Sequence, residues 1–374
     1  MAKGPPATGA SLLSYAHLVC VRYAGSSFVT SVWRKNRALA AGVPTVISGL
    51  DQDEHTLTPG YLARNFGKEK VEVIDTTTGE SQEQDFGQFL ATFADASLQD
   101  PPLKVKDWPP DSDFRLKFPG LYRWFEGHLT GPDVTTMEGN LNLESGMPEG
   151  SCPPDTGPKG YLAHGAAGGL STLLHCDMTD AINHCFNARR SDGSKGGAVW
   201  TTIHRDDMDA ATAWLRREKR GQFAGHPIHA QTISLTDDDV ERLRHDRIRV
   251  ARFEQLEGET VVIPVGVPHQ VANNSPCIKI AKDYVTPFNT ESSVKIGREL
   301  REHRLLTRKG AEELQSEDVL QLNCMSWWYL QRSQLRELQL ARSDPDSNPW
   351  VSRISAAPYC LRAPARIAAG NAQL

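Results

Sequence analysis

Apolar and polar positions alternate in short, changing patterns along this sequence, and their spacing predicts five segments. Apolar residues at every second position are typical of strands, whereas spacings of three and four are typical of helices. Stretches with neither pattern and many Gly, Pro, Ala or Ser residues predict loops or disorder. The predicted segments are a disordered lead (1–10), an N-terminal α+β segment (11–128), a β-rich segment (129–290) that holds a helical insert (205–245), C-terminal helices (291–345) and a loose tail (346–374).

The N-terminal segment combines helical and strand patterns. Helices are expected over Ser31–Ala41 and Phe86–Ala94, and strands over Pro44–Ser48 and Lys70–Asp75. Residues 98–112 are rich in Pro and Asp and predict an extended connector.

The β-rich segment contains short β-branched runs separated by Gly, Pro and Asn, as in an all-β barrel or jelly roll. Its insert shows helical patterns at Arg205–Lys219 and Thr236–His245, and Thr236 is placed to cap the second helix. Helices are also expected over Ser292–Leu306 and Ser316–Ala341. The predicted fold is mostly β with flanking helices.

Composition narrows the class of protein only slightly. A hydrophobic content of 39% and a charged content of 23% are ordinary for a globular chain, and a net charge of −5 gives no general attraction to nucleic acid. No run approaches the ~20 apolar residues of a membrane span, so we expect a soluble intracellular protein without membrane contact. The seven cysteines contain no C-x-x-C pair, which disfavours a zinc ribbon, and their scatter disfavours a disulfide framework.

One motif carries most of the chemical information. Residues 258–273 follow the spacing G-x5-P-x-G-x2-H-x3-N, in which a turn, an apolar strand and a Pro-Gly bend lead into His269. This spacing is the second metal motif of the cupin-type double-stranded β-helix. Several fixed positions match together, so His269 is a predicted metal ligand.

The other half of the predicted metal site lies upstream, at His175 and Asp177. Two ligands at positions i and i+2 of a strand point to the same face and can bind one ion. An all-histidine cupin would have His rather than Asp at position 177. Two histidines and one carboxylate form the facial triad of non-haem Fe(II) oxygenases, which leaves positions open for co-substrate and O2. We therefore predict that His175, Asp177 and His269 bind Fe(II) and are catalytic.

An oxygenase of this type uses 2-oxoglutarate, whose far carboxylate needs a cation and polar donors inside the barrel. Lys279 lies among apolar residues on a strand-like run and would suit a buried anion. Asn183 lies an even number of residues after His175 and Asp177, so its side chain faces the same side if that strand continues unbroken. Thr172 has the opposite parity and reaches the pocket only if the strand is irregular there. An edge lysine that extends to solvent is the alternative for Lys279.

Other features are not assigned to the site. His226 and His229 could look like a metal pair, but a structural role beside the barrel is expected because one metal site is already complete. The acidic run 237–239 suits a helix N-terminus. Trp327, Trp328 and Tyr329 are expected to pack against the core or a second subunit, so the C-terminal helices predict a homodimer contact.

With these motifs, residues of about 42 to 300 resemble the jumonji C catalytic region of the histone lysine demethylase 3 group, which includes the hairless protein. The resemblance extends over the metal motifs and over several further landmarks. These landmarks are Gly42–Gly49, Leu103–Pro110 with its Asp-Trp-Pro-Pro run, Leu141–Leu143, Gly157–Tyr161, Thr172–Asp177, His226–Gln231, Ile263–Val271 and Cys277–Pro287.

The resemblance implies a cupin-like double-stranded β-helix and an Fe(II)- and 2-oxoglutarate-dependent dioxygenase. Its implied reaction is demethylation of mono- and dimethylated histone H3 lysine nine, through N-methyl hydroxylation and formaldehyde release. Thr172, Asn183 and Lys279 become the candidate 2-oxoglutarate contacts, and Tyr161 would lie near the methylammonium, where an aromatic face favours a cation. A methylated histone H3 tail or another basic protein as partner, ascorbate as reductant, a role in chromatin regulation and a nuclear location are implied in the same way.

The sequence also departs from the group. His164 stands where an aromatic residue is expected near the substrate, and the run Asn183–Asn187 is more polar than the group's strand at that place. Two alternatives therefore stay open. One is a protein hydroxylase of the same fold that forms a stable alcohol, and the other is a catalytically inactive metal-binding chromatin scaffold.

Overall fold

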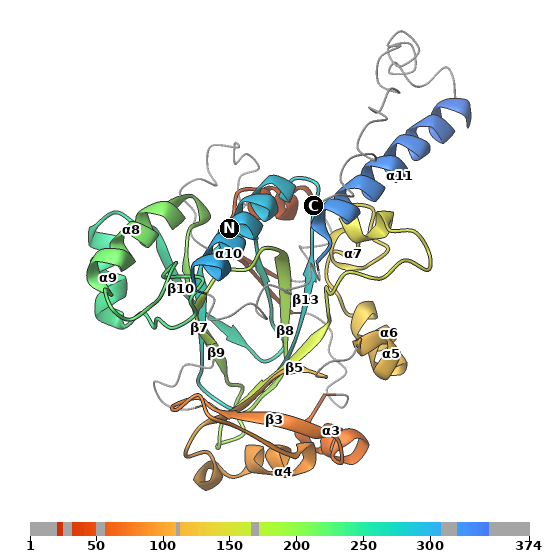
Figure 1. The fold of residues 1–374 in the computed structure, drawn as a ribbon. Helices are drawn as coiled ribbons and strands as arrows, with labels where there is room; N and C mark the ends of the chain where they lie inside the picture. The colour runs from red at the N-terminus through yellow and green to blue at the C-terminus, as the bar shows by residue number, and fades with distance from the viewer. Residues whose placement is uncertain are drawn as a thin grey trace, which may run out of the picture.

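Two β-sheets form the centre of the computed structural model, which describes residues 21–24, 32–49, 57–109, 113–165, 172–307 and 320–343 (Figure 1). The larger sheet has the strand order β1-β2-β11-β8-β13-β6-β5-β3-β4, and the smaller one has the order β10-β9-β12-β7. The strands of the larger sheet are β1 (Val21–Ala24), β2 (Thr45–Ser48), β3 (Lys70–Asp75), β4 (Ser81–Asp85), β5 (Leu103–Trp108), β6 (Lys159–Ala163), β8 (Asp180–Ala188), β11 (Thr260–Ile263) and β13 (Cys277–Tyr284). Those of the smaller sheet are β7 (Thr172–His175), β9 (Gly197–Ile203), β10 (Val250–Leu256) and β12 (His269–Asn273).

The chain passes repeatedly between the sheets, so that several neighbouring strands are distant in sequence. Strand β12 lies between β7 and β9, and β8 lies between β11 and β13, all in antiparallel pairs. A buried apolar cluster joins strands of both sheets through Val46, Trp200, Val261 and Val271. This is the predicted double-stranded β-helix, or jelly roll.

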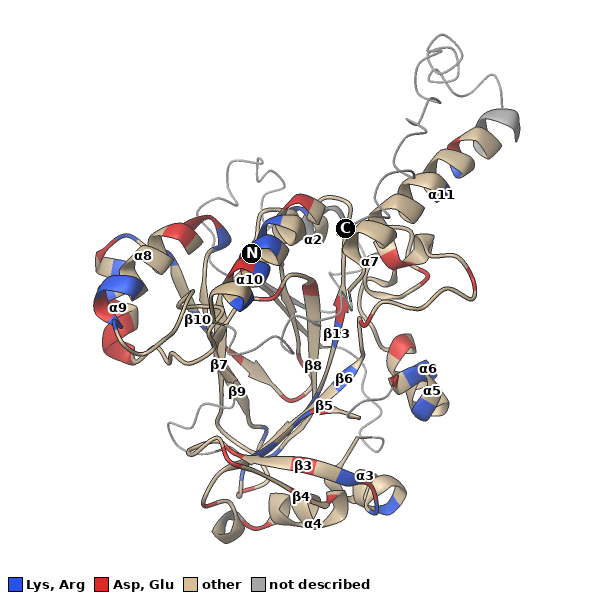
Figure 2. Cartoon of the chain, in the orientation of Figure 1, with Lys and Arg blue, Asp and Glu red and all other residues tan. Residues whose placement is uncertain are grey.

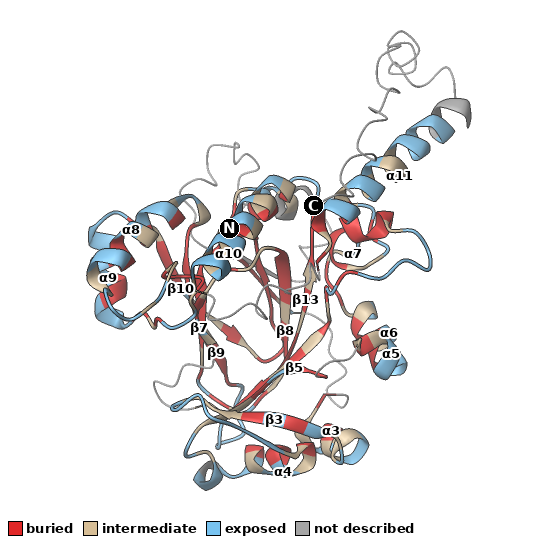
Figure 3. Ribbon diagram, in the orientation of Figure 1, coloured by how far each residue is buried: buried red, intermediate tan, exposed pale blue. Residues whose placement is uncertain are grey.

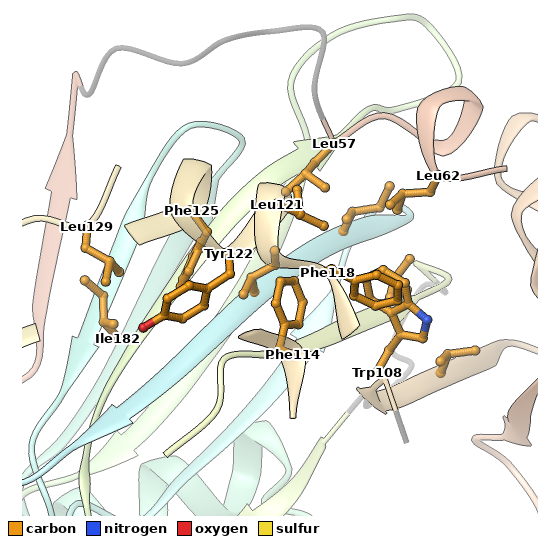
Figure 4. Packing of buried hydrophobic residues seen from close by; sticks show 14 of the residues in the cluster. Leu57, Leu62, Trp108, Phe114, Phe118, Leu121, Tyr122, Phe125, Leu129 and Ile182 are labelled. Carbon is orange, nitrogen blue, oxygen red and sulfur yellow. The ribbon is translucent and has the colours of Figure 1, made fainter. Parts of the chain in front are cut away.

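The N-terminal segment extends the larger sheet and covers it with short helices around an aromatic core (Figure 4). Its helices are α2 (Val32–Ala40), α3 (Pro59–Phe66), α4 (Phe86–Ala91), α5 (Phe114–Lys117) and α6 (Pro119–Gly127), with 3-10 turns η3 (Thr92–Ala94) and η4 (Ala96–Leu98). Helix α7 (Pro132–Thr135) and the 3-10 turn η5 (Leu143–Gly146) follow at the start of the β-rich segment. The ring of Trp108 stacks on Phe118 with centroids 4.7 Å apart, and it meets Phe114 edge-on. The helices and strands predicted between residues 31 and 94 are confirmed.

The prediction of an extended connector over residues 98–112 is wrong in its centre. Residues Leu103–Trp108 form β5, which pairs with β3 and β6. The strand is short and lies between prolines, which hide its pattern, but Val105 and Trp108 are buried and fix it in the sheet.

The predicted insert contains η6 (Arg205–Asp207), α8 (Met208–Glu218) and α9 (Asp237–His245). Thr236 caps α9 as expected. Its hydroxyl accepts a hydrogen bond from the Asp239 N–H, and the Asp239 carboxylate accepts one from the Thr236 N–H. Acidic residues occupy the first turn of α9 and basic ones its last turn, in the order that the helix dipole favours (Figure 2).

Two helices follow the barrel, α10 (Thr290–Thr307) and α11 (Leu322–Ser343). Helix α10 packs on the barrel through Ile296 and Leu300. Helix α11 is anchored at its start by Leu322 and Met325 and is largely exposed beyond them (Figure 3). Within the described ranges, the helices are too short or too polar to cross a membrane.

Candidate active site

The three predicted metal ligands lie together at one end of the smaller sheet. His175 is the last residue of β7, Asp177 follows in the loop, and His269 begins β12 directly opposite His175. The Asp177 carboxylate oxygens lie 3.7 Å from His175 Nε2 and 3.7 Å from His269 Nε2. One donor atom from each residue lies within 4.8 Å of the others. Because β7 ends at His175, Asp177 reaches this position from the loop and not by strand parity.

Both histidine rings are held in the tautomer that a metal needs. The Nδ1 of His175 lies 2.9 Å from the Leu173 carbonyl, and the Nδ1 of His269 lies 3.0 Å from the Val267 carbonyl. Each Nδ1 therefore carries the proton and donates it, and each Nε2 offers its lone pair toward Asp177. Burial, with the neighbouring His175, lowers the pKa of His269 to about 4, so this ring is neutral near pH 7. The donor set fits Fe(II).

The loop that carries Asp177 is tied to the turn ahead of His269. The Gly266 N–H donates to the Asp177 carbonyl at 3.2 Å. The Val265 N–H donates to the Asp180 carboxylate at 2.9 Å, and Thr286 and Asn289 donate to the same carboxylate. The Pro-x-Gly motif thus fixes both halves of the triad through its backbone.

A cavity of about 370 Å³ opens beside the triad and contains all seven predicted site residues. Deep in it, Lys279 Nζ donates to Asn273 Oδ1 at 2.9 Å and lies 5.9 Å from the centre of the Trp200 ring. Lys279 is 5% exposed, so it does not extend to solvent as an edge lysine would. A buried ammonium group with one amide partner is suited to a carboxylate ligand.

Thr172 lines the cavity through the strand irregularity that its parity required, whereas Asn183 lines it for a reason other than shared parity. The pairing of β7 with β12 shifts by one residue between His269 and Val271, and this irregularity lets Thr172 line the cavity. The strand after Asp177 does not continue β7, because β8 belongs to the larger sheet. Asn183 nevertheless lines the cavity from β8, and the Gln255 amide donates to its backbone carbonyl at 2.9 Å.

Tyr161 lies where this cavity meets a larger one of about 830 Å³. Val105, Lys106, Asp107, Ala281 and Asp283 also line both cavities. Burial and the nearby Asp107, to which the phenol is hydrogen-bonded, raise the pKa of Tyr161 well above its usual value. Burial and the neighbouring Asp177 raise the pKa of Asp283 to about 8.

Four further residues line the cavity that were not predicted from the sequence as site residues, namely Asp107, Asp283, Asn273 and Trp200. Strand parity could have found two of them, since Asp283 is in phase with Lys279 on β13 and Asn273 with His269 on β12. Asp107 gave no such signal, because its backbone has a positive φ of 55° at the irregular end of β5.

The two departures from the group have local structural explanations. His164 is absent from the residues that line the two cavities, and it stacks on Phe89 with ring centroids 5.5 Å apart. Its Nδ1 accepts from the Leu103 N–H at 3.1 Å, and its Nε2 lies 2.6 Å from the Thr92 hydroxyl. In the polar run on β8, His184 is buried with its Nδ1 2.5 Å from the Thr260 hydroxyl.

The comparison with protein families points to the same type of site as the geometry does. Residues 190–284 match the family "JmjC domain, hydroxylase". The chain resembles the JmjC hydroxylases. The matched part of this JmjC-like chain includes His269 and Lys279, and His175 and Asp177 precede it.

The relatives of the JmjC-like chain are demethylases. It is 29% identical over 329 residues to lysine-specific demethylase 3A of Homo sapiens, which covers 75% of this chain and 25% of the relative. It is 30% identical over 259 residues to lysine-specific demethylase JMJ26 of Arabidopsis thaliana, which covers 54% of this chain and 30% of the relative. The chain thus spans 25% and 30% of the lengths of these two relatives. Together the matches support a 2-oxoglutarate-dependent oxygenase.

Proposed function

We propose that this chain is an Fe(II)- and 2-oxoglutarate-dependent lysine demethylase that acts on a methylated histone tail, with mono- and dimethylated histone H3 lysine nine as its substrate. The observation that carries the proposal is the shared cavity, in which two Nε2-presenting histidines and Asp177 lie beside the buried ammonium of Lys279. The names of the relatives support lysine demethylation.

The residues of the cavity have separate roles in this proposal. His175, Asp177 and His269 hold the metal, and Lys279 binds the far carboxylate of 2-oxoglutarate, assisted by Thr172 and Asn183. The bound iron and co-substrate supply the oxidising chemistry that hydroxylates an N-methyl carbon, with loss of formaldehyde. The buried position of Lys279 excludes water from its ion pair and so strengthens it.

The charged residues that line the larger cavity support the proposal of a cationic substrate. Glu72, Asp107, Asp113, Asp155 and Asp283 line it, together with Lys106, Arg115 and Lys159. Arg115 pairs with Asp113 at 2.8 Å, so the two charges cancel. Lys106 lies 3.8 Å from Asp107, and Lys159 lies 3.8 Å from Asp155. Glu72 and Asp283 are the acidic residues of the lining that remain after these pairs.

A methylated lysine that passes through this cavity would meet Tyr161 and Asp283 before it reaches the triad. Its positive charge would lower the raised pKa of Asp283 and so favour the ionised carboxylate.

The test compares methylated and unmethylated histone H3 tail peptides. Protein loaded anaerobically with Fe(II) is given 2-oxoglutarate and oxygen, and succinate and formaldehyde are measured, with His175→Ala as the blank. We expect formaldehyde that depends on the methylated peptide and disappears in the variant.

The other outcomes separate the two alternatives. Succinate without formaldehyde on any methylated peptide would contradict demethylation and favour the protein hydroxylase. The absence of both products from a protein that still binds Fe(II) would favour the inactive scaffold.

Three further features belong to the same proposal and rest on the resemblance or on the sequence. They are a dependence on ascorbate as reductant, a nuclear location, and a homodimer formed through α11. The exposed Trp327 and Trp328 on α11 support the last of these.

A further inference from the structure

A second group of metal-ligating side chains lies away from the triad. His226 and His229 belong to the turn after α8, and Glu299 lies in α10, about 70 residues later in the chain. One donor atom from each of the three lies within 4.8 Å of the others. Only the two histidines could be paired from the sequence, because nothing in the sequence links Glu299 to them.

Two members of the group lie at a separation close to that of two ligands on one small ion. His229 Nε2 lies 3.2 Å from Glu299 Oε2, a hydrogen-bond contact. In a tetrahedral zinc site with bonds of about 2.0–2.2 Å, two ligand atoms are about 3.3–3.6 Å apart. The rings of His226 and His229 are stacked, with centroids 4.2 Å apart and planes inclined by 27°.

A bound ion would replace hydrogen bonds that the cluster makes. His229 Nε2 is hydrogen-bonded to the Glu299 carboxylate. His226 Nδ1 accepts from the His229 N–H at 3.4 Å, and His226 Nε2 lies 3.4 Å from the Thr212 hydroxyl. The His229 side chain is fully buried, and its Nδ1 has no hydrogen-bond partner among the described residues.

The turn that holds the histidines connects directly to the active-site cavity. Gln231 follows His229 by two residues and lines that cavity. Two residues further, the Ile233 carbonyl accepts from the Leu174 N–H at 3.0 Å, next to His175. The backbone of Gly225, with a φ of 67°, lets the turn approach His303 of α10, whose Nδ1 accepts from the His226 N–H at 3.1 Å.

We propose that His226, His229 and Glu299 form a structural zinc site, with a water molecule as the fourth ligand. The ion holds the turn of residues 225–231 against α10 and thereby keeps Gln231 in the wall of the active-site cavity. Zinc is favoured over Fe(II) because zinc binds sites of the same nitrogen and oxygen donors more tightly.

The test uses the full chain with the triad removed by His175→Ala and Asp177→Ala, so that any remaining zinc is bound elsewhere. Zinc alone is titrated in competition with a chromophoric chelator, and the bound metal is counted by atomic emission. We expect one zinc per chain. Adding His229→Ala or Glu299→Gln should remove it, with at least a hundredfold loss of affinity, whereas His245→Ala, an exposed histidine on α9, should keep it.

Thermal melting checks that the variants still fold. Glu299→Gln keeps the size of the side chain, so its melting temperature without metal should match that of the parent. Zinc should raise the melting temperature of the parent by several degrees and leave that of Glu299→Gln unchanged. The inference is overturned if the triad-free parent binds no zinc, or if the folded Glu299→Gln variant binds it as tightly as the parent.

Discussion

Gly266 connects backbone conformation to the metal site. Its φ is 76°, its N–H donates to the Asp177 carbonyl, and a Cβ there would lie 3.1 Å from Arg205 Cδ. A residue other than glycine costs about 1–2 kcal/mol in this left-handed conformation. The Pro-x-Gly spacing was visible in the sequence, but its second function, holding the Asp177 loop, required the fold.

We expect Gly266→Ala to lower the free energy of unfolding by about 1–2 kcal/mol and to weaken Fe(II) binding. The matched control is Gly193→Ala, which has the same kind of strain at a φ of 81° but no neighbouring atom within 4 Å and no link to the triad. Urea unfolding and anaerobic Fe(II) titration measure the two effects. Equal Fe(II) affinity in the two variants would contradict the role given to Gly266.

His164 makes the free energy of unfolding depend on pH. Burial lowers its pKa to about 4, below the value of about 6.5 for an unfolded histidine. The unfolded state therefore takes up the proton first, so this contribution to stability is complete above about pH 6.5 and is lost as the pH falls toward 4. At pH 5.5 the loss is on the order of 1 kcal/mol.

Denaturant unfolding of the wild type and of His164→Gln at pH 7.5 and 5.5 measures this contribution. The difference in the free energy of unfolding between the two pH values should shrink by roughly 1 kcal/mol in the variant. His245→Gln, which changes an exposed histidine, should leave it unchanged. An unchanged pH difference in His164→Gln would mean that the His164 ring is protonated as easily in the folded state as in the unfolded chain.

At the scale of elements, the two faces of β13 have different surroundings. Lys279, Ala281 and Asp283 line the active-site cavity, whereas Lys282 points away from it and pairs with the buried Glu144, its Nζ 3.5 Å from Oε2. Lys279 lies deep in the active-site cavity, where we propose that 2-oxoglutarate binds, and Asp283 lies where the two cavities join.

Substitutions on β13 should therefore change the KM for 2-oxoglutarate and the KM for the peptide independently. Lys279→Met is expected to raise the KM for 2-oxoglutarate about 10- to 100-fold, the loss of one hydrogen bond to a charged group. Asp283→Asn should raise the KM for the peptide and leave that for 2-oxoglutarate near its original value. Lys282→Met should lower stability and change neither KM. Steady-state kinetics with each substrate varied would reveal an error if Lys279→Met changed only the peptide KM.

Some helices were predictable from the sequence, but the placement of one strand was not. The helices around residues 31–41 and 236–245 were predictable because their periodicity and the Thr236 cap are local. The position of Asn183 was not, because the chain changes sheets between His175 and Asp180, and strand parity does not continue across such a change. The proximity of Glu299 to His229 is likewise a property of packing.

At the scale of the whole molecule, α11 bears an apolar surface that the described part of the chain does not cover. Trp327 is 54% exposed and Trp328 is 41% exposed, whereas Tyr329 is anchored by its hydroxyl to the Asn140 carbonyl at 2.7 Å. Large exposed apolar patches are typical of protein–protein contacts.

We expect the wild-type chain to be a dimer in solution and the double variant Trp327→Ser, Trp328→Ser to be a monomer. Light scattering gives the mass of each. Leu116→Ser is the control, since Leu116 is 83% exposed on α5, away from α11. A monomeric wild type, or a dimer that survives the double substitution, would contradict a contact through α11.

The central claim is that one site holds Fe(II) through His175, Asp177 and His269 and 2-oxoglutarate through Lys279. The most direct measurement is an anaerobic titration of the Fe(II) protein with 2-oxoglutarate, followed by the visible charge-transfer absorption of the chelate. We predict a saturable band with one equivalent of each component, absent in Asp177→Ala and shifted to much higher 2-oxoglutarate concentration in Lys279→Met. A band of unchanged intensity in Asp177→Ala, or none in the wild type, would contradict the account.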